Sequence, residues 1–281
     1  MMARLAILLC LAAVPVAAQG RVVSLDYCAD QYVMALAEPA EIAAVSPAAG
    51  SEYSYLAHRS VGLPRMRPTG EQVLLAAPDV VVRQWGGGYN ATAYLDRFEI
   101  PVAQISFGLD IESARSNLRN VAAALGAEAR AEEIIRDMDE RLARIRTTQR
   151  PGEERPRALY VTPGGITAGS DTFIHELLTA AGVVNMGAEG GRAGWHEIDL
   201  EAMAVNPPDL IVGAFFDLKS NHVNYWSIAR HSFLRQTMRE TPTVLIPGAQ
   251  VACAAWFFVD AVEAVHEAAR TLTLQRLARR E

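Results

Sequence analysis

The sequence predicts an α/β protein in which two units, each built on a mostly parallel sheet, are joined by one long helix. Three observations favour this fold. Short runs rich in Val, Ile and Leu alternate with amphipathic helical stretches along the chain. One long internal segment, 127–149, contains neither Gly nor Pro. A stretch of the first unit also recurs without gaps in the second.

The N-terminus has the pattern of an export signal. Arg4 precedes the apolar run 5–13, and small residues at Val16 and Ala18 suit cleavage before the next residue. The run is too short to cross a bilayer comfortably, and we find no later apolar stretch of spanning length. We therefore interpret residues 1–18 as a signal peptide.

The net charge of the chain argues against an anionic partner. It is -6 at neutral pH, and the positive charge is almost entirely Arg. A polyanion such as nucleic acid attracts proteins of the opposite sign. We therefore expect no nucleic-acid partner.

The first unit, 19–126, carries four candidate strands separated by helical patterns. They are short, β-branched runs at 21–25, 42–45, 80–83 and 101–105. The second unit, 151–281, repeats the pattern with candidate strands at 158–161, 210–212 and 243–246. Strands that alternate with helices in this way indicate parallel sheets.

The segment between the units is predicted to be one continuous helix, and we assign 127–150 as the link. Apolar residues recur there at helical spacing, at Ala131, Ile134, Ile135, Met138, Leu142 and Ile145. Pro151 and Gly152 then end the helix. At ~1.5 Å per residue it would span roughly 30 Å, about the width of a small domain.

An internal repeat relates the two units. Residues 71–82 match 201–212 without a gap, and each copy indicates a short helix, a Pro-Asp turn and a buried strand. The repeat equates the loops after the two strands, which contain Trp85 and its glycines in one unit and Phe215 in the other. Ligands of open parallel sheets bind beyond the carboxyl ends of the strands, so these loops are candidate walls of a cleft.

The loop after residue 83 is the best candidate for ligand contact. Trp85 is followed by three glycines, which let a ligand approach the backbone, and Tyr89 comes next. Arg83 could pair with a negative charge on the ligand or be a solvated strand-end charge. The glycines do not have the spacing of a dinucleotide or phosphate loop.

Two cysteines remain after the signal peptide, Cys28 and Cys253. An exported protein meets an oxidising compartment, which permits a disulfide between them. Two separately buried thiols are the other interpretation.

The order of these features resembles the periplasmic binding proteins for cobalamin, ferric siderophores and haem. The resemblance covers nearly the whole mature chain. It is carried by the opening strand and loop 21–26, the helix, turn and strand of 71–82, the glycine loop at Trp85, and the stretches 166–170 and 194–198. It implies two Rossmann-like lobes joined by a single long α-helix, with the ligand cleft between them.

The same resemblance implies a function and a set of residues. It implies a monomeric periplasmic receptor that delivers a metal chelate to an ABC permease and its ATPase, with no cofactor or metal of its own. Cleft positions would include Asp26, Tyr27, Trp195 and Trp256 beside the residues given above, and docking acids would lie on each lobe. Where the cobalamin receptor has a glutamate after its glycine loop, this chain has Asn90-Ala91-Thr92, so Asp96 and Asp217 are the nearest candidates.

Two alternatives come from other classes of protein. A receptor for bare zinc or manganese would need clustered histidines, but these are scattered, and only His196, beside Trp195, is a candidate ligand-contacting residue. An exported hydrolase would need a nucleophile or zinc motif, and neither His-Glu-x-x-His nor Gly-x-Ser-x-Gly occurs. Among the chelates, we expect a ferric siderophore ahead of cobalamin or haem.

Overall fold

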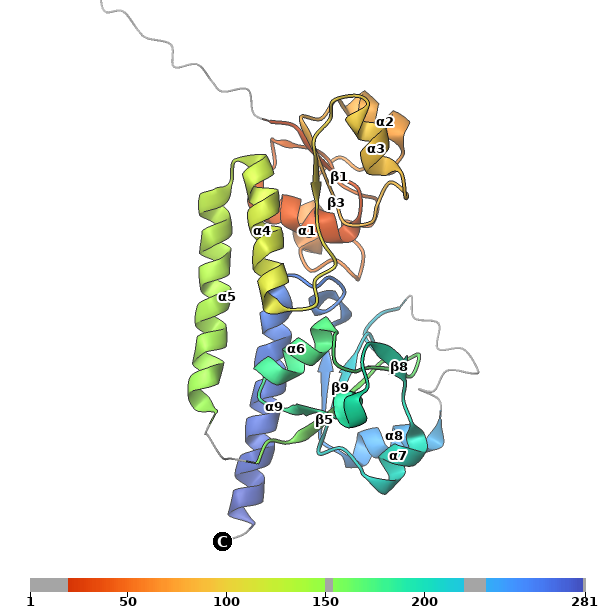
Figure 1. Cartoon of the computed structure of the whole chain (residues 1–281), viewed down its shortest axis with the longest axis vertical. Coiled ribbons are helices and arrows are strands. Elements are labelled where there is room, and N and C mark those ends of the chain that lie inside the picture. Colours follow the sequence, from red (N-terminus) through yellow and green to blue (C-terminus); the bar gives the residue numbers. More distant parts are fainter. Residues whose placement is uncertain (1–19, 150–153, 220–230, 280–281) are drawn as a thin grey trace, which may run out of the picture.

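The computed structural model describes residues 20–149, 154–219 and 231–279. The predicted signal peptide lies outside these residues. Two α/β lobes are stacked along one long helix, α5 (Glu128–Thr148), which runs beside both of them (Figure 1). In the described residues, no helix has the length and apolar character needed to cross a membrane.

The N-terminal lobe is built on a four-stranded parallel sheet in the order β2-β1-β3-β4. Helices cover both faces of this sheet, α1 and α4 on one side and α2 and α3 on the other. The elements are β1 (Val22–Ser24), α1 (Tyr27–Leu36), β2 (Ile42–Ala44), α2 (Gly70–Ala76), β3 (Val80–Arg83), α3 (Ala91–Asp96), β4 (Val102–Gln104) and α4 (Ile111–Leu125).

The C-terminal lobe has the same topology. Read from β7, its four-stranded parallel sheet has the order β7-β5-β9-β10, which in chain order within the lobe is again second, first, third, fourth. Its main elements are β5 (Arg157–Val161), α6 (Phe173–Ala180), β7 (Val184–Asn185), α7 (Leu200–Val205), β9 (Leu210–Ala214), α8 (Ser232–Glu240), β10 (Thr243–Ile246) and α9 (Val259–Ala278). An antiparallel pair, β6 (Ile166–Ala168) with β8 (Trp195–Glu197), stands apart from this sheet and was not predicted.

The sequence repeat forms equivalent structure in the two lobes. Each copy makes a short helix followed by the third strand of its sheet, α2 with β3 and α7 with β9. Asp79 accepts a hydrogen bond from the backbone N–H of Arg21 at 2.6 Å, and Asp209 accepts one from that of Arg157 at 2.8 Å. The Pro-Asp turn therefore ties the start of the third strand to the start of the first strand in both lobes.

Helix α5 contributes to both hydrophobic cores. Ala131 and Ile135 pack into the core of the N-terminal lobe, whereas Met138, Leu142 and Ile145 pack into that of the C-terminal lobe. The predicted stripe is therefore continuous but shared between two cores. We propose that the chain divides into lobes on either side of this helix.

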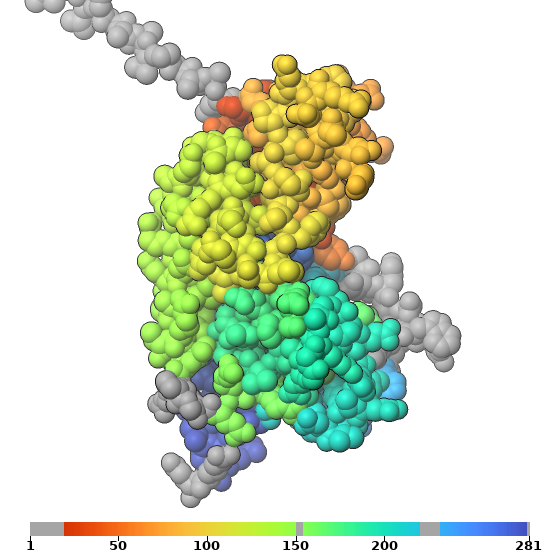
Figure 2. Space-filling view, in the orientation of Figure 1, coloured from red at the N-terminus to blue at the C-terminus, as the bar shows by residue number. Residues whose placement is uncertain are grey.

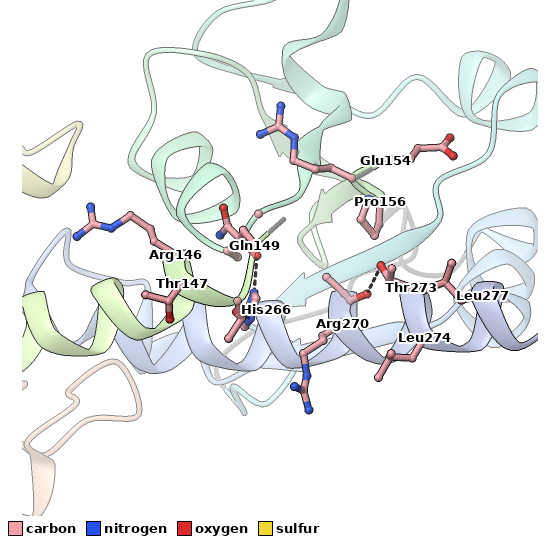
Figure 3. A pocket seen from close by; sticks show the side chains of 15 residues that line it. Arg146, Thr147, Gln149, Glu154, Pro156, His266, Arg270, Thr273, Leu274 and Leu277 are labelled. Atoms are coloured by element: carbon pink, nitrogen blue, oxygen red, sulfur yellow. Dashed lines mark hydrogen bonds between the residues drawn. The ribbon is translucent and has the colours of Figure 1, made fainter. Parts of the chain in front are cut away.

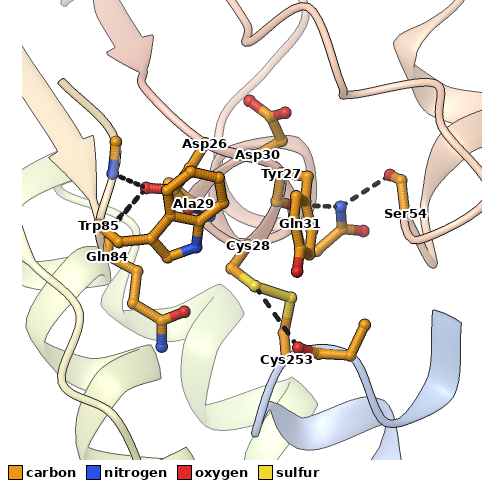
Figure 4. The surroundings of a disulfide bond; sticks show 12 residues. Asp26, Tyr27, Cys28, Ala29, Asp30, Gln31, Ser54, Gln84, Trp85 and Cys253 are labelled. Atoms are coloured by element: carbon orange, nitrogen blue, oxygen red, sulfur yellow. Dashed lines mark hydrogen bonds between the residues drawn. A yellow bond between two sulfur atoms is a disulfide. The ribbon is translucent and has the colours of Figure 1, made fainter. Parts of the chain in front are cut away.

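A second connection crosses between the lobes after β10. The segment 247–258 includes two short 3-10 turns, η4 (Gly248–Gln250) and η5 (Trp256–Phe258), and leads into α9. Within it, Cys253 forms a disulfide with Cys28 of α1, with 5.6 Å between their Cα atoms, so the open question about the cysteines is resolved in favour of a bridge (Figure 4). Phe257 packs into the core of the N-terminal lobe and Phe258 into that of the C-terminal lobe.

Polar contacts reinforce this junction. The ring of Tyr55, from the N-terminal lobe, stacks on Phe257 with 4.3 Å between ring centroids, and its hydroxyl donates to Asp260 of α9 at 2.6 Å. Arg141 of α5 binds Asp260 at 2.6 Å and Glu263 at 2.5 Å. The N-terminal lobe, the linking helix and the C-terminal helix thus meet in one network.

Candidate ligand-binding site

The carboxyl edges of the two sheets face each other. Cys28 follows β1 and Cys253 follows β10, so the disulfide joins the carboxyl-end loops of the two sheets. Glu52 of the N-terminal lobe also accepts a hydrogen bond from the backbone N–H of Lys219, which follows β9, at 2.7 Å. The surface is hollowed between the yellow N-terminal and teal C-terminal parts, on the side away from α5 (Figure 2). This is the position that the strand-end rule gives for a ligand.

Aromatic side chains gather on the N-terminal wall of this hollow. The rings of Tyr27 and Trp85 meet edge to face at 5.5 Å, and Tyr53 lies 5.7 Å from Tyr27. Trp85 is 47% exposed and Phe107, in the loop after β4, is 71% exposed. The sequence had singled out Tyr27 and Trp85 but not Tyr53 or Phe107, because neither follows a recognisable motif.

Tyr27 lies at the base of this aromatic group. Burial, followed by the proximity of Tyr53 and Asp26, raises the pKa of its phenol above the ordinary value of 10.0. The phenol is therefore protonated at neutral pH. It presents an apolar ring and a hydrogen-bonding hydroxyl.

Asp26 is buried behind this wall. One carboxylate oxygen caps α1 by accepting from the N–H of Ala29 at 2.9 Å. The other accepts from the consecutive N–H groups of Gln84, Trp85 and Gly86, at 2.8, 3.1 and 2.9 Å (Figure 4). The sequence pattern could place Asp26 at the strand end but could not show that its carboxylate turns inward.

Arg83 is also buried, and its guanidinium holds the other side of the same loop. It donates to the carbonyl oxygens of Gly86 and Gly88 at 2.8 and 3.1 Å, and to the hydroxyl of Thr92 at 2.9 Å. Within the described residues it forms no ion pair. The two interpretations offered for Arg83, a ligand contact or a solvated charge, both differ from this arrangement, since the side chain is neither solvated nor directed at the cleft surface.

Three glycines give the loop its shape. A Cβ on Gly86 would lie 2.2 Å from the carbonyl oxygen of Leu25, so no side chain fits there. Gly87 and Gly88 have φ angles of 82° and 84°, in the left-handed region that favours glycine. Tyr89, which follows, is fully exposed and makes no ring contact in the described part of the chain.

The C-terminal wall is less aromatic. Trp195 is 57% exposed at the start of β8, and its ring lies 6.2 Å from that of the buried Tyr160. The ring nitrogens of His196 lie 3.1 Å from the carbonyl oxygen of Glu197 and 2.9 Å from that of Gly187. Phe215 is partly buried against the core of the C-terminal lobe. Of these candidates, Trp195 is the one with a large exposed aromatic face.

Trp256 was expected to line the cleft, but it lies elsewhere. Its ring packs edge to face on Tyr32 and on Phe257, each at 5.1 Å, and it contacts both hydrophobic cores. With Phe257 and Arg141 it lines a pocket of about 290 Å³ against α5, on the opposite side of the junction from the aromatic wall. The sequence expectation was wrong about its surroundings because the segment after β10 turns towards α5.

The two candidate docking acids are both exposed but differ in environment. Asp96 ends α3. Asp217 accepts a hydrogen bond from the backbone N–H of Gly248, at 3.0 Å, and so helps to fold the loop after β9. The internal repeat, which could have suggested further acids, places Glu71 and Glu201 at equivalent exposed positions in the first turns of α2 and α7.

A pocket of about 670 Å³ lies far from the cleft, between the end of α5, the start of β5 and α9. It is lined by Arg146, His266 and Arg270, among others, but the side chains of Arg146 and Arg270 point away from each other (Figure 3). The two ring nitrogens of His266 are hydrogen-bonded, one to the hydroxyl of Thr148 and the other to the carbonyl oxygen of Ala181. Among the described residues, no group of His, Cys, Asp and Glu side chains could hold a metal ion.

Several solved structures with this fold are described as heme-binding or Fe3+-hydroxamate transport proteins. The structure resembles the periplasmic heme-binding protein RhuT from Roseiflexus sp. RS-1, with a TM-score of 0.69, 20% sequence identity, and 89% of this chain and 99% of that chain covered. For the periplasmic heme-binding protein HutB of Vibrio cholerae the TM-score is 0.69 with 18% identity over 92% and 99%. For an ABC-type Fe3+-hydroxamate transport protein from Saccharomonospora viridis DSM 43017 it is 0.63 with 18% identity over 89% and 93%.

The sequence itself matches a family model. A search among curated proteins gave no match. The family of periplasmic binding proteins matches residues 22–238, which include most of both lobes and all of the linking helix. Proteins of this family bind and hand over substrates and are not enzymes, which agrees with the predicted class of protein. With two parallel α/β lobes on one long helix and a family match over most of its length, the chain belongs to the periplasmic binding protein family.

Proposed function

We propose that this protein captures a metal chelate with a broad flat face in the periplasm and delivers it to an ABC permease and its ATPase. The observation that carries this proposal is the aromatic group of Tyr27, Tyr53 and Trp85 at the carboxyl edge of the first sheet, with the exposed Phe107 in the loop after β4 of the same sheet. Aromatic faces provide apolar area at a low cost in conformational entropy. They suit a ring system better than a small hydrated ion.

The character of the wall guides the choice among chelates. A ferric catecholate is highly anionic and would need several cationic partners, whereas Arg83 is buried and engaged by loop oxygens. A tetrapyrrole, either haem or a corrinoid, matches flat aromatic faces more closely. Phenol oxygens such as those of Tyr27 and Tyr53 also belong to the side chains that can bind haem iron. We therefore place a tetrapyrrole ahead of the ferric siderophore that the sequence favoured.

Titration of the mature chain tests this proposal. We expect haemin or cyanocobalamin to bind at one equivalent, with a shift in the absorbance of the chelate and quenching of tryptophan fluorescence. A ferric hydroxamate and a ferric catecholate should bind more weakly. Binding of Zn²⁺ or Mn²⁺ alone, or of no compound in this panel, would contradict the proposal.

Delivery requires a docking surface, and we propose that acids on both lobes provide it. The repeat favours Glu71 and Glu201 over Asp96 and Asp217, because the first two occupy equivalent positions in the two lobes. Substituting both with Ala should lower the receptor-stimulated ATPase activity of the permease and leave chelate affinity unchanged. The Asp96→Ala and Asp217→Ala pair is the matched comparison, and a larger loss there would reverse the preference.

A further inference from the structure

We propose that Asp26 and Arg83 are positioning residues of the ligand site, which fix the loop 84–88 so that Trp85 is in place before a ligand arrives. This inference rests on the proposed function for its consequence in binding. The fixed loop itself can be tested in the ligand-free protein.

Asp26 and Arg83 bind different backbone groups of the loop 84–88. Asp26 accepts from the three consecutive N–H groups of residues 84, 85 and 86. Arg83 donates to the carbonyl oxygens of Gly86 and Gly88. Asp26 and Arg83 therefore hold the peptide units on the two sides of Gly86 from opposite directions. The backbone that carries Trp85 has few alternative conformations.

Burial separates both charged groups from the cleft surface. Both side chains are at least nine-tenths buried, so a ligand lying on the wall would touch Trp85 and not the charged groups behind it. Asp26 is also the N-cap of α1, whose first residue is Tyr27. One carboxylate thus fixes the backbone of both aromatic residues, whose rings meet at 5.5 Å.

The same network extends to the loop after β4. The side chain of Gln84 donates to the carbonyl oxygen of Ser106 at 3.2 Å, and that of Gln104 donates to the carbonyl oxygen of Gln84 at 2.7 Å. Asn117 accepts from the N–H and hydroxyl of Ser106, at 3.0 and 2.9 Å. Phe107, next to Ser106, is therefore joined to the same fixed edge.

A lower population of the competent loop conformation weakens ligand binding. If the competent loop conformation falls to a tenth of the molecules, the apparent Kd rises about ten-fold with no contact to the ligand removed. Asp26→Asn keeps the shape of the side chain but replaces one accepting oxygen with a donor. Arg83→Lys keeps the charge but loses the planar fork that reaches several acceptors.

The test combines two measurements on the same variants. Amide hydrogen exchange of the peptide covering 84–88 is followed in the ligand-free protein, and Kd is measured for haemin and cyanocobalamin. We expect Asp26→Asn and Arg83→Lys to accelerate exchange in this peptide and to raise Kd about ten-fold. Asp79→Asn is the matched control, because Asp79 also accepts a backbone N–H but lies at the opposite end of the same sheet. It should change neither measurement.

Each alternative result overturns a defined part of the proposal. Wild-type affinity in Arg83→Lys would mean that only its charge matters. A raised Kd with unchanged exchange would mean direct ligand contact, and faster exchange with unchanged Kd would mean that a fixed loop is not needed. If Asp26→Asn does not fold, Gly88→Ala replaces it, since a Cβ there meets no atom within 4 Å and only the φ of 84° is disturbed. If wild-type protein binds neither probe, the proposed function fails, and hydrogen exchange still decides whether the two residues fix the loop.

Discussion

Trp85 stands on the surface of the cleft, whereas Trp256 is packed between the two cores, so truncation of each should have a different consequence. For Trp85→Ala we expect chelate affinity to fall roughly ten- to a hundred-fold. A stacked ring contributes ~1 kcal/mol to the binding free energy beyond the contribution of the apolar area that it buries. Its unfolding free energy should change little. For Trp256→Ala we expect a loss of about 3–5 kcal/mol in stability.

Ligand titration and urea denaturation of the two variants check this pair of outcomes. Each protein is the control for the other, because the same side chain is removed from the same fold. Normal binding by Trp85→Ala together with a large loss of stability would show that Trp85 belongs to the core.

Asp30 is a buried carboxyl whose titration should be visible in stability. Burial raises its pKa from the ordinary 3.8 to about 6, although Ser24 and Ser46 donate hydrogen bonds that lower it. The folded state therefore binds this proton more tightly than the unfolded state. The contribution of Asp30 to stability is complete below about pH 4 and is lost as the pH rises through about 6.

The comparison with Asp30→Asn isolates this effect from the other carboxyls. The unfolding free energy of the wild type minus that of the variant should fall between pH 4 and pH 7, by at most about 3 kcal/mol. Denaturation curves at a series of pH values give this difference. A constant difference across the range would show that Asp30 keeps an ordinary pKa.

At the level of single residues, sequence reasoning found positions more readily than roles. It placed Asp26 and Arg83 at the right edge of the sheet, because Asp26 follows one recognisable strand and Arg83 ends another. Their partners are backbone groups of a loop distant in sequence from Asp26, and no residue pattern encodes such contacts. Tyr53 joins the wall through a loop with no periodicity, so nothing in its neighbourhood predicted it.

At the level of elements, short continuous aliphatic runs were the most predictable. Strands β3 and β10 were predicted with the observed bounds, because each is a compact β-branched or aliphatic run that follows a proline turn. The pair β6 and β8 was missed because the two strands are three residues long and meet only through antiparallel pairing across the lobe. Helix α5 was predicted to within one or two residues, because its apolar stripe meets one core after the other along a single face.

The disulfide links elements that are far apart in the chain. Cys28 and Cys253 are separated by 225 residues, so closing this loop removes much conformational freedom from the unfolded chain. The chain-entropy model gives a stabilisation of up to about 5 kcal/mol. The Cys28→Ser, Cys253→Ser protein should therefore unfold at lower urea concentration than the wild type made in the periplasm. Two free thiols in denatured, unreduced wild-type protein would contradict the bridge.

At the level of the whole molecule, several connections restrict movement of the lobes. They include the continuous helix α5, the disulfide, and the network of Tyr55, Arg141 and Asp260. A helix packed into two cores bends less readily than a pair of extended strands. We therefore expect the radius of gyration to change very little when the chelate binds, and the scattering curves of free and bound protein to nearly superimpose.

A variant that lacks two of the connections sharpens this expectation. Cys28→Ser, Cys253→Ser and Arg141→Met together remove the disulfide and the ion pairs to Asp260 and Glu263, while α5 remains. If these links restrain the lobes, the variant should show a larger difference between free and bound scattering than the wild type, with its aromatic wall unchanged. A large fall in the radius of gyration of the wild type on binding would show instead that the lobes close about a hinge despite these links. Equal, small changes in both proteins would mean that the disulfide and the Arg141 ion pairs do not restrain the lobes.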